Sequence, residues 1–435
     1  MRKPSLKILS MSVELKTPPG EAIAERPPHW RRENFIPVRK AELVDVLATQ
    51  PALSAVEQSD FRQFCRLLEC LYHYEFHREL EDLKNAYAPF DPDADTQAIT
   101  TAAQAPAAEQ QLDGLFDKFV WLLQRANFVR LSQTDVAAAV GAASDWGLRL
   151  SVDFDLFERL EVFARGDVVG RRERRRWRNL MRPEQVDVPI YQRLVIICRM
   201  RDGRHLDSRS SPHHVYIKTF KNIPKIDLDM LLPGSRVKMS LFDQGKIILP
   251  TVSGLAITGW KLFQGAVVVA VAGVYGMLTF LGLLAGTLGY GVKSFFGYLR
   301  TQQKYQLNLT RSLYYQNLDN NAGVLFRLLD EAEEQECREA FLAYYFLWRH
   351  GGAEGWTSER LDGEIESFLD REIEVKIDFE VGDALAKLRR LQLIEEPTPG
   401  CWRAMPIDRA LSALDRCWDD LFCHAPAAPR DANAA

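Results

Sequence analysis

The sequence predicts a mostly α-helical α+β membrane protein with a helical N-terminal domain, a small β-sheet, a transmembrane helical hairpin and a C-terminal winged-helix-like module. Three observations lead to this prediction. Apolar residues recur at helical spacing towards both ends of the chain, and β-branched and aromatic runs gather between them. In Leu249–Leu299, Lys261 and Lys293 are the only charged side chains. A helix that spans a bilayer needs about 20 apolar residues.

Outside this segment, the composition is that of an ordinary globular protein. The 435 residues are 47% hydrophobic and 26% charged, with a formal net charge of -4, so the chain as a whole does not attract nucleic acid. The seven cysteines are scattered and never spaced as CxxC, which predicts reduced thiols. Residues 1–30 lack the apolar core of a signal peptide and contain several prolines, so we expect a disordered arm.

Residues 31–185 are predicted to form an α-helical domain, because apolar residues repeat there with the period of an amphipathic helix. A segment rich in Ala, Asp, Thr and Pro at 91–110 indicates a linker within it. The expected helices are Pro37–Tyr87, Leu112–Arg125, Thr134–Trp146 and Asp153–Ala164.

Residues 186–250 are predicted to form a small β-rich domain. Three runs of β-branched and aromatic residues are bounded by Asp-Gly, Pro-Gly and Gln-Gly turn signals, a pattern typical of short strands. The expected strands are Val188–Cys198, His214–Phe220 and Val237–Phe242.

Residues 251–299 are predicted to cross the membrane as a helical hairpin that turns near Gly273 and Gly276; a single tilted helix over Leu262–Val292 is the alternative. Basic residues flank the segment on both sides, so a hairpin keeps all of them in the cytoplasm, whereas a single helix divides them. These residues are Lys246, Lys261, Lys293, Arg300 and Lys304. The expected location is therefore a membrane, with several passes and both termini cytoplasmic.

Residues 331–424 are predicted to form a winged-helix-like module, followed by a loose tail at 425–435. Thr357 and Asp378 are the expected N-caps of its second and third helices. The module contains 18 acidic and 8 basic residues between Glu331 and Gly400, a net charge of -10. This charge excludes DNA, because phosphate neutralisation supplies most non-specific affinity, and favours a protein partner. The expected elements are helices over Glu331–Arg349, Thr357–Arg371 and Asp378–Leu393, and a strand over Cys401–Met405.

One constellation of metal-ligand type lies on the first long helix. Glu69, His73, His77 and Glu81 follow each other at i, i+4 spacing, which places all four side chains on one helix face. Two imidazoles and a carboxylate on such a face are a candidate metal site, although a solvated polar helix face gives the same pattern. The chain contains no Walker A, GxGxxG, GxSxG or paired CxxC motif, so no cofactor is predicted.

Basic residues concentrate around Trp177. One interpretation of the cluster is contact with anionic lipid headgroups, to which each basic residue would contribute on the order of 1 kcal/mol. The alternatives are RNA binding around Trp177 and a solvated helix that pairs with the protein's own acidic surface. The residues are Arg171, Arg172, Arg174, Arg175, Arg176 and Arg178.

Residues 300–330 are predicted to be a juxtamembrane Asn-rich segment. Its polar side chains are expected to cap helices or to form a buried hydrogen-bond network, and ion coordination is the alternative. These side chains are Gln316, Asn317, Asp319, Asn320 and Asn321.

Within this segment, Leu309–Leu325 resembles the uncharacterised transmembrane protein 143-like family, which shares a domain of unknown function. The likeness extends from Phe35 to Glu396. It implies a membrane protein of bacteria and organelles with soluble flanks, whose animal relatives are associated with mitochondria, and for this chain we expect the bacterial inner membrane. It implies no activity, so no functional residue is carried over. Further matching segments are Ala126–Val129, Phe220–Pro224, Leu231–Pro233 and Asp330–Glu334.

The predicted function is that of a membrane-anchored, non-enzymatic adaptor or assembly factor that docks a protein partner on its acidic C-terminal module. One alternative is a metal-dependent enzyme or ion-handling protein that uses the helix face with His73 and His77. Another is an oligomeric transporter or channel assembled through the GxxxG motif of Gly282 and Gly286. No biochemical activity or substrate is predicted.

Overall fold

The computed structural model describes residues 33–50, 53–96, 108–132, 134–136, 149–175, 183–202, 211–233, 236–238, 314–373 and 376–421, and six isolated positions between 260 and 296. The chain divides into two compact units. The first comprises Met1–Leu131, Glu158–Thr219 and Asp319–Ala435, and the second comprises Ser132–Phe157 and Phe220–Leu318.

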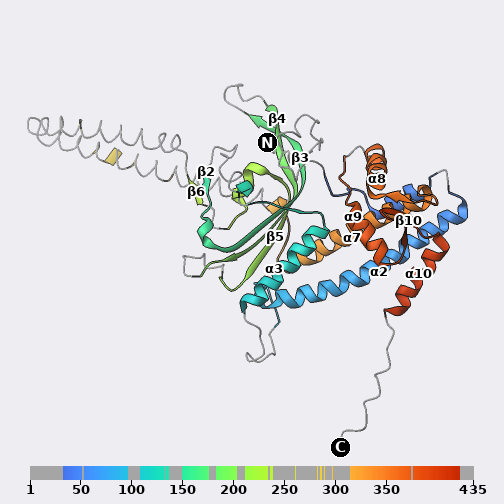
Figure 1. The fold of residues 1–435 in the computed structure, drawn as a ribbon. Helices are drawn as coiled ribbons and strands as arrows, with labels where there is room; N and C mark the ends of the chain where they lie inside the picture. The colour runs from blue at the N-terminus through green and yellow to red at the C-terminus, as the bar shows by residue number, and fades with distance from the viewer. Residues whose placement is uncertain are drawn as a thin grey trace, which may run out of the picture. The chain divides into compact units, whose positions relative to one another are not determined.

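The first unit begins with the helices α1 (Lys40–Ala48), α2 (Ala55–Tyr87) and α3 (Ala108–Arg125), and the 3-10 turn η3 (Ala88–Phe90) follows α2 (Figure 1). Helices α1 and α2 are separate because Ser54 starts α2 with a capping box. The Ser54 hydroxyl accepts a hydrogen bond from the Glu57 backbone at 3.3 Å, and the Glu57 carboxylate accepts one from the Ser54 backbone at 2.8 Å. The single helix predicted over this region is therefore two helices.

Helix α7 (Ala322–His350) is the centre of the first unit and packs against α1, α2, α3 and α9. Its residues from Ala340 to Leu347 are all buried, as expected for a helix with apolar residues on every side. Aromatic rings join it to α2, with Phe64 stacked on Tyr344 at a centroid distance of 3.9 Å. The main core of this unit is thus helical.

The C-terminal module continues from α7 with β8 (Trp356–Thr357), α8 (Ser358–Ile373), α9 (Val381–Arg390), β9 (Ile394–Thr398), β10 (Cys401–Ala404) and α10 (Ile407–Asp420). Its three strands form an antiparallel sheet in the order β8-β10-β9. Thr357 acts at the start of α8 as predicted, since its hydroxyl accepts a hydrogen bond from the Arg360 backbone at 3.3 Å. The predicted cap at Asp378 is wrong, because α9 starts at Val381 without a side-chain cap.

A five-stranded sheet has the order β1-β3-β4-β5-β7. This sheet corrects the prediction of a helix over Asp153–Ala164, because strand β3, which starts at Phe157, occupies most of that segment. Residues 161–166 are all buried, so the sequence lacks the alternation that marks a half-buried strand. The region predicted to be wholly helical therefore contributes strands to the sheet. The strands are β1 (Val129–Arg130), β3 (Phe157–Arg175), β4 (Pro183–Met200), β5 (Val215–Pro224) and β7 (Asn317–Asn320).

The second unit is described in small part. Its strands β2 (Arg149–Ser151) and β6 (Arg236–Lys238) pair antiparallel, and it also contains the 3-10 turns η5 (Phe154–Leu156) and η7 (Lys225–Met230). The carboxylate of Asp153 accepts a hydrogen bond from the Asp155 backbone at 3.2 Å and so caps η5.

The structure corrects the prediction of a multi-pass membrane protein. Among the residues that it describes, no helix is both long enough and apolar enough to cross a bilayer. The fold class is α+β with a small sheet, and the transmembrane hairpin and the inner-membrane location that rested on it are wrong. Apart from the six isolated positions, which include Gly282 and Gly286, residues 251–299 lie outside the described residues, as do 1–30 and 425–435.

Candidate functional site

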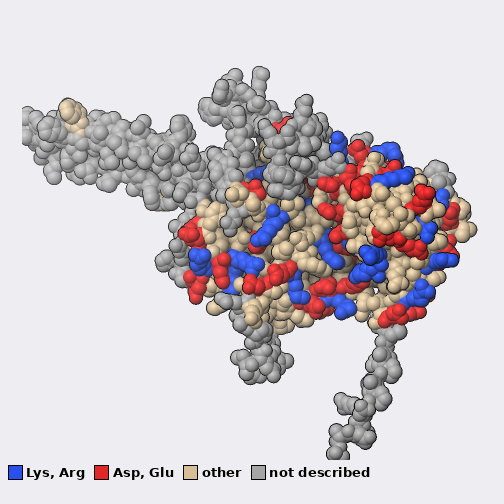
Figure 2. Space-filling view, viewed as in Figure 1, with Lys and Arg blue, Asp and Glu red and all other residues tan. Residues whose placement is uncertain are grey.

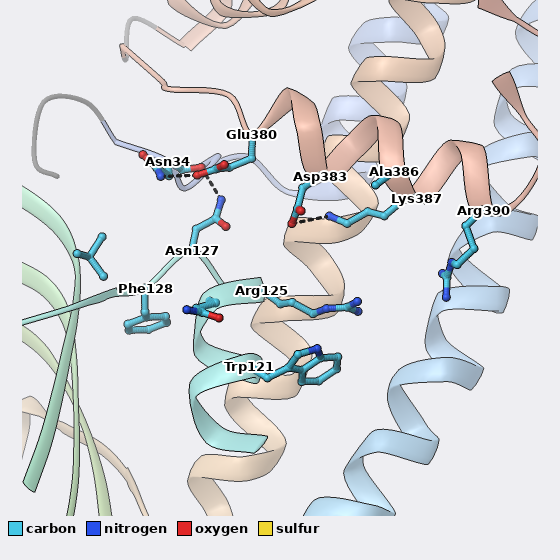
Figure 3. A pocket seen from close by; sticks show the side chains of 12 residues that line it. Asn34, Trp121, Arg125, Asn127, Phe128, Glu380, Asp383, Ala386, Lys387 and Arg390 are labelled. Atoms are coloured by element: carbon cyan, nitrogen blue, oxygen red, sulfur yellow. Dashed lines mark hydrogen bonds and ion pairs between the residues drawn. The ribbon is translucent and has the colours of Figure 1, made fainter. Parts of the chain in front are cut away.

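A cleft of about 580 Å³ lies in the first unit between the end of α3 and α9 (Figure 3). Its volume is in the range of about 300–1,000 Å³ that small-ligand sites usually have. One wall comes from α3 and the residues that follow it, and the other comes from α9 of the C-terminal module. The lining residues include Asn34, Trp121, Arg125, Glu380, Asp383 and Arg390.

Asn127 joins three chain segments at one end of the cleft. Its φ of +55° is a left-handed conformation that Asn adopts more readily than most residues, and it turns the chain from α3 into β1. Its side-chain amide donates hydrogen bonds to the backbone oxygen of Asn34 at 2.8 Å and to Oε1 of Glu339 at 3.1 Å. The segment before α1, the end of α3 and helix α7 are thereby held together.

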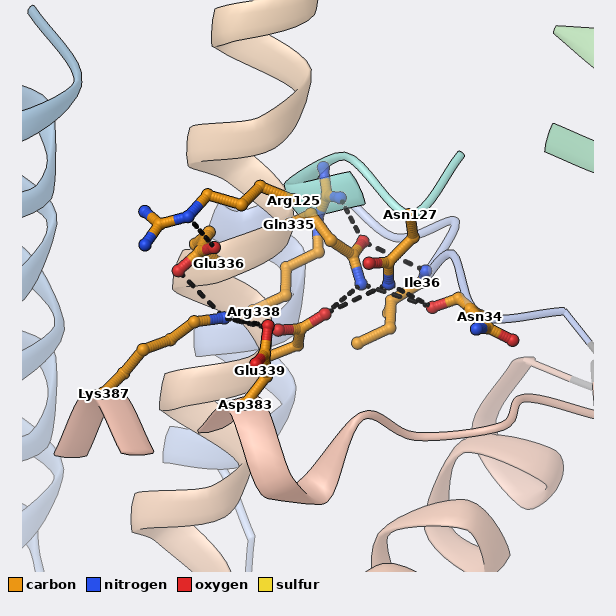
Figure 4. A network of polar contacts seen from close by, with 10 residues as sticks. All are labelled: Asn34, Ile36, Arg125, Asn127, Gln335, Glu336, Arg338, Glu339, Asp383 and Lys387. Carbon is orange, nitrogen blue, oxygen red and sulfur yellow. Dashed lines mark hydrogen bonds and ion pairs between the residues drawn. The ribbon is translucent and has the colours of Figure 1, made fainter. Parts of the chain in front are cut away.

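Beneath the cleft lies a buried ionic cluster centred on Lys387 of α9 (Figure 4). Its Nζ is 2.8 Å from Oε2 of Glu336 and 2.8 Å from Oε2 of Glu339, both on α7. Burial alone lowers the pKa of Lys387, but the carboxylates of Glu339 and Glu336 outweigh it, so the pKa lies above its ordinary value. The ammonium group therefore stays protonated at neutral pH.

Gln335 extends this cluster to the segment before α1. Its side-chain amide is fully buried; Nε2 donates to Oε1 of Glu339 at 2.8 Å, and Oε1 accepts from the backbone of Ile36 at 3.2 Å (Figure 4). The guanidinium of Arg338 donates to Oε1 of Gln335 at 3.3 Å and also pairs with Glu334. Because a buried polar group without a partner costs about 1–3 kcal/mol, such a connected network fixes the positions of its members.

The opposite end of the cleft combines aromatic and cationic side chains. The guanidinium of Arg125 lies 4.3 Å from the ring centre of Trp121, and its Nε is 3.5 Å from Oε1 of Glu336. Arg390 pairs with Glu75 of α2 at 2.7 Å. A smaller cavity of about 240 Å³ shares Trp121, Arg125 and Arg390 with the cleft and continues to α2. The two cavities adjoin at these three residues.

The predicted metal-ligand residues all lie on α2, where Glu69 and His73 contact other helices and Glu81 contacts a lysine of α2 itself. Glu69 pairs with Lys40 at 2.6 Å, and Nδ1 of His73 is 3.0 Å from Oε2 of Glu333. His77 is exposed, and Glu81 pairs with Lys84 at 2.8 Å. Across the described part of the chain, no three His, Cys, Asp or Glu side chains come together in a group that could hold a metal ion.

The arginine cluster lies at the end of a strand and beyond it. Arg171, Arg172, Arg174 and Arg175 belong to β3, where a helix was one of the alternatives. Arg176 and Arg178 lie outside the described residues.

The Asn-rich segment contains a network of hydrogen bonds at the start of α7. Asn321 donates from its backbone to the oxygen of Ile217 at 2.7 Å, and its Oδ1 accepts from the Ile217 backbone at 3.2 Å. Its Nδ2 donates to Asp93 at 2.6 Å. Asn321 therefore links the N-terminus of α7 to strand β5 and to the segment that follows η3, a structural role of the kind expected for this segment.

The sequence analysis missed Lys387, Glu336 and Glu339. One signal was present: α7 carries acidic residues at 331, 333, 334, 336 and 339. At 100° per residue these positions surround the helix, so one exposed face cannot hold all of them. Some had to face the protein interior, where a buried carboxylate needs a partner.

On the face shown in Figure 2, acidic and basic side chains of the described residues are interspersed. Part of the negative charge counted for the C-terminal module is neutralised by basic residues from outside it. Glu331 pairs with Arg165 at 2.8 Å, and Nε of Arg125 lies 3.5 Å from Oε1 of Glu336. The net charge of -10 therefore overstates the negative charge that a partner meets.

Comparison with known families gives one match. The profile described as "Protein of unknown function (DUF3754)" matches residues 191–323, which include part of β4, all of β5 and β7, and the first residues of α7. No solved structure matches the chain. Nothing in these comparisons supports the transmembrane protein 143-like name. The cleft lies outside the matched residues. Residues 191–323, less than half of the chain, are thus similar to DUF3754, a domain of unknown function.

Proposed function

We propose that this protein is a non-enzymatic adaptor whose ligand site is the cleft between α3 and α9. The observation that carries this proposal is the cleft itself, which is assembled from the segment before α1, the end of α3 and helix α9 over a buried ionic floor. A wall from the C-terminal module places the ligand against that module. The ligand site therefore agrees with the docking role expected from the sequence.

Lys387, a cation of the cleft, is suited to holding charged groups in place and not to chemistry on a ligand. It is kept protonated by Glu339 and Glu336, so it is neither a nucleophile nor a general base at neutral pH.

The likeness to the transmembrane protein 143-like family brings no activity with it and leaves this proposal unchanged. The metal-dependent alternative gains no support, because Glu69 and Glu81 are each held by a lysine.

The proposal is tested by filling the cleft. Ala386 is an exposed residue of α9 that lines it, so Ala386→Trp places an indole in the cleft without changing any charge. Ser367→Trp on the exposed surface of α8 is the matched control. Both variants and the wild-type chain are used as baits, and each captured partner is then purified and its effect on hydrogen exchange of α3 and α9 is measured. We expect a partner that protects both helices and is lost with Ala386→Trp alone. Identical partner sets for all three baits would refute the proposal.

A further inference from the structure

We propose that the cleft binds a basic peptide segment, with an arginine or lysine side chain of the ligand lying between Glu380 and Asp383. This inference rests on the proposed function, because it names the chemical class of the ligand for the same cleft. It follows from which charged groups of the cleft already have partners and which remain available.

Every cation that lines the cleft is held by a carboxylate of the protein. Lys387 contacts Glu336 and Glu339 at 2.8 Å each, and its side chain is 9% exposed. Arg390 pairs with Glu75 at 2.7 Å. Arg125 lies 3.5 Å from Glu336. An anionic ligand would have to compete with these pairs.

Competition for the buried pairs is costly. If an anion drew Lys387 or Arg125 away, the carboxylate of Glu336 would lose a partner while its side chain is 2% exposed. Removing one partner of a buried ion pair destabilises by several kcal/mol, because a charge then remains in a medium that solvates it poorly. The lining cations are therefore poor anchors for a negatively charged ligand.

In contrast to the lining cations, two carboxylates of the cleft are available to bind a ligand. Glu380 accepts one hydrogen bond, from the amide of Asn34 at 2.6 Å. Asp383 is 3.8 Å from Nζ of Lys387, which already has two closer carboxylates, and its side chain is 65% exposed. Both residues belong to the α9 side of the cleft, and Figure 3 shows them on the same stretch of chain. A cationic group that binds there gains two carboxylates, while Lys387 keeps its two closer carboxylates, Glu336 and Glu339.

The overall charge of the site points in the same direction. Three cations and two carboxylates line the cleft, and the three carboxylates that hold these cations bring the net charge of the whole group to -2. Partial burial and the neighbouring carboxylates of Glu339 and Asp383 raise the pKa of Glu380, as expected in a region of negative potential. The five carboxylates are Glu75, Glu336, Glu339, Glu380 and Asp383.

The shape of the site suits a chain segment. The cleft adjoins the smaller cavity at Trp121, Arg125 and Arg390, so an extended peptide can continue from one into the other. The second cavity carries two further acids, Glu79 and Asp82, and one further cation, Arg78, all on α2. Both cavities therefore offer carboxylates to consecutive basic side chains of one ligand.

Three short peptides test this inference by calorimetric titration of the full chain: a Gly-Arg repeat, a Gly-Glu repeat and a Gly-Gln repeat. We expect the Gly-Arg peptide to bind most tightly and to lose affinity when the salt concentration is raised. The double variant Glu380→Gln, Asp383→Asn should weaken it by about fivefold or more, since an exposed charge pair contributes up to about 1 kcal/mol. Ala386→Trp should abolish binding.

A control with the same change in net charge is available on the exposed surface. Glu354→Gln with Asp370→Asn should leave the affinity within about twofold, because neither residue lines the cleft. Equal affinity of the two double variants would overturn the assignment of Glu380 and Asp383. Tighter binding of the Gly-Glu peptide that Ala386→Trp removes would overturn the basic ligand and keep the proposed function. Absence of binding by any peptide, together with partner capture that Ala386→Trp does not alter, would overturn both.

Discussion

Replacing Lys387 by Met removes the cation from the buried ionic cluster while keeping a side chain of similar length. Glu336 and Glu339 then lose the ammonium group that lies 2.8 Å from each of them, with side chains only 2% and 3% exposed. Removing one partner of a buried ion pair costs about 3–5 kcal/mol. We expect Lys387→Met to lower the free energy of unfolding by this amount.

The measurement is equilibrium unfolding of the full chain in urea, a denaturant that does not screen charges, followed by circular dichroism and tryptophan fluorescence. Arg403→Met is the matched control, because Arg403 forms an ion pair of the same 2.8 Å length with Glu395 at the surface, where the side chains are 39% and 47% exposed. An exposed pair of this kind contributes about 0–1 kcal/mol. Equal losses for the two variants would refute the reasoning.

A triple variant separates the loss of a charge partner from a loss of packing. Glu336→Gln and Glu339→Gln added to Lys387→Met remove the unpaired charges, so we expect about 1–3 kcal/mol of the lost stability to return. If the triple variant is as unstable as Lys387→Met, the defect lies in packing and the electrostatic account fails.

The other predictions concern the backbone and the buried titratable groups. Gly355 has a φ of +77°, and a Cβ there would lie 2.6 Å from the backbone oxygen of Trp402, so Gly355→Ala should cost about 1–3 kcal/mol in urea unfolding. Gly363→Ala, in the middle of α8 with open space around it, should instead stabilise by about 0.5–1 kcal/mol, and a loss there would contradict the helix assignment. Burial raises the pKa of Cys198 to about 12 and also raises that of Tyr344, above ordinary values of 9.0 and 10.0. Above pH 9.0 these groups stay protonated in the folded chain but begin to ionise in the unfolded chain. The free energy of unfolding that they contribute is therefore complete below pH 9.0 and falls at higher pH. Unfolding curves that do not change between pH 8 and 11 would contradict this.

Local patterns in the sequence were sufficient to find much of the C-terminal module. The predicted helix over Thr357–Arg371 agrees with α8, and the strand over Cys401–Met405 agrees with β10. These elements depend on side-chain spacing, caps and turns within a few residues, which the sequence displays directly. The helix predicted from Glu331 starts earlier, at Ala322, because the contacts of Asn321 with Ile217 and Asp93 determine where α7 begins.

The apolar segment at 251–299 gave the prediction of a membrane hairpin, and apart from six isolated positions it lies outside the described residues. A long run without charges predicted transmembrane helices, yet no helix in the described part of the chain meets the length and hydropathy that a span requires. Buried strands caused a related error at β3, because a segment that is buried on both faces has no alternation and its pattern does not distinguish it from a buried helix.

The sequence by itself determined the positions of α8 and β10, the acidic excess of the C-terminal module and the number of acids on α7. The tertiary structure alone decided which of those acids are buried and which cations neutralise them. Glu380 meets Asn34 across 346 positions of the chain, and Glu336 meets both Arg125 and Lys387. The physical reason is that helix period and capping act over about four residues, whereas an ion pair depends on which helix faces pack together, and no local pattern records that.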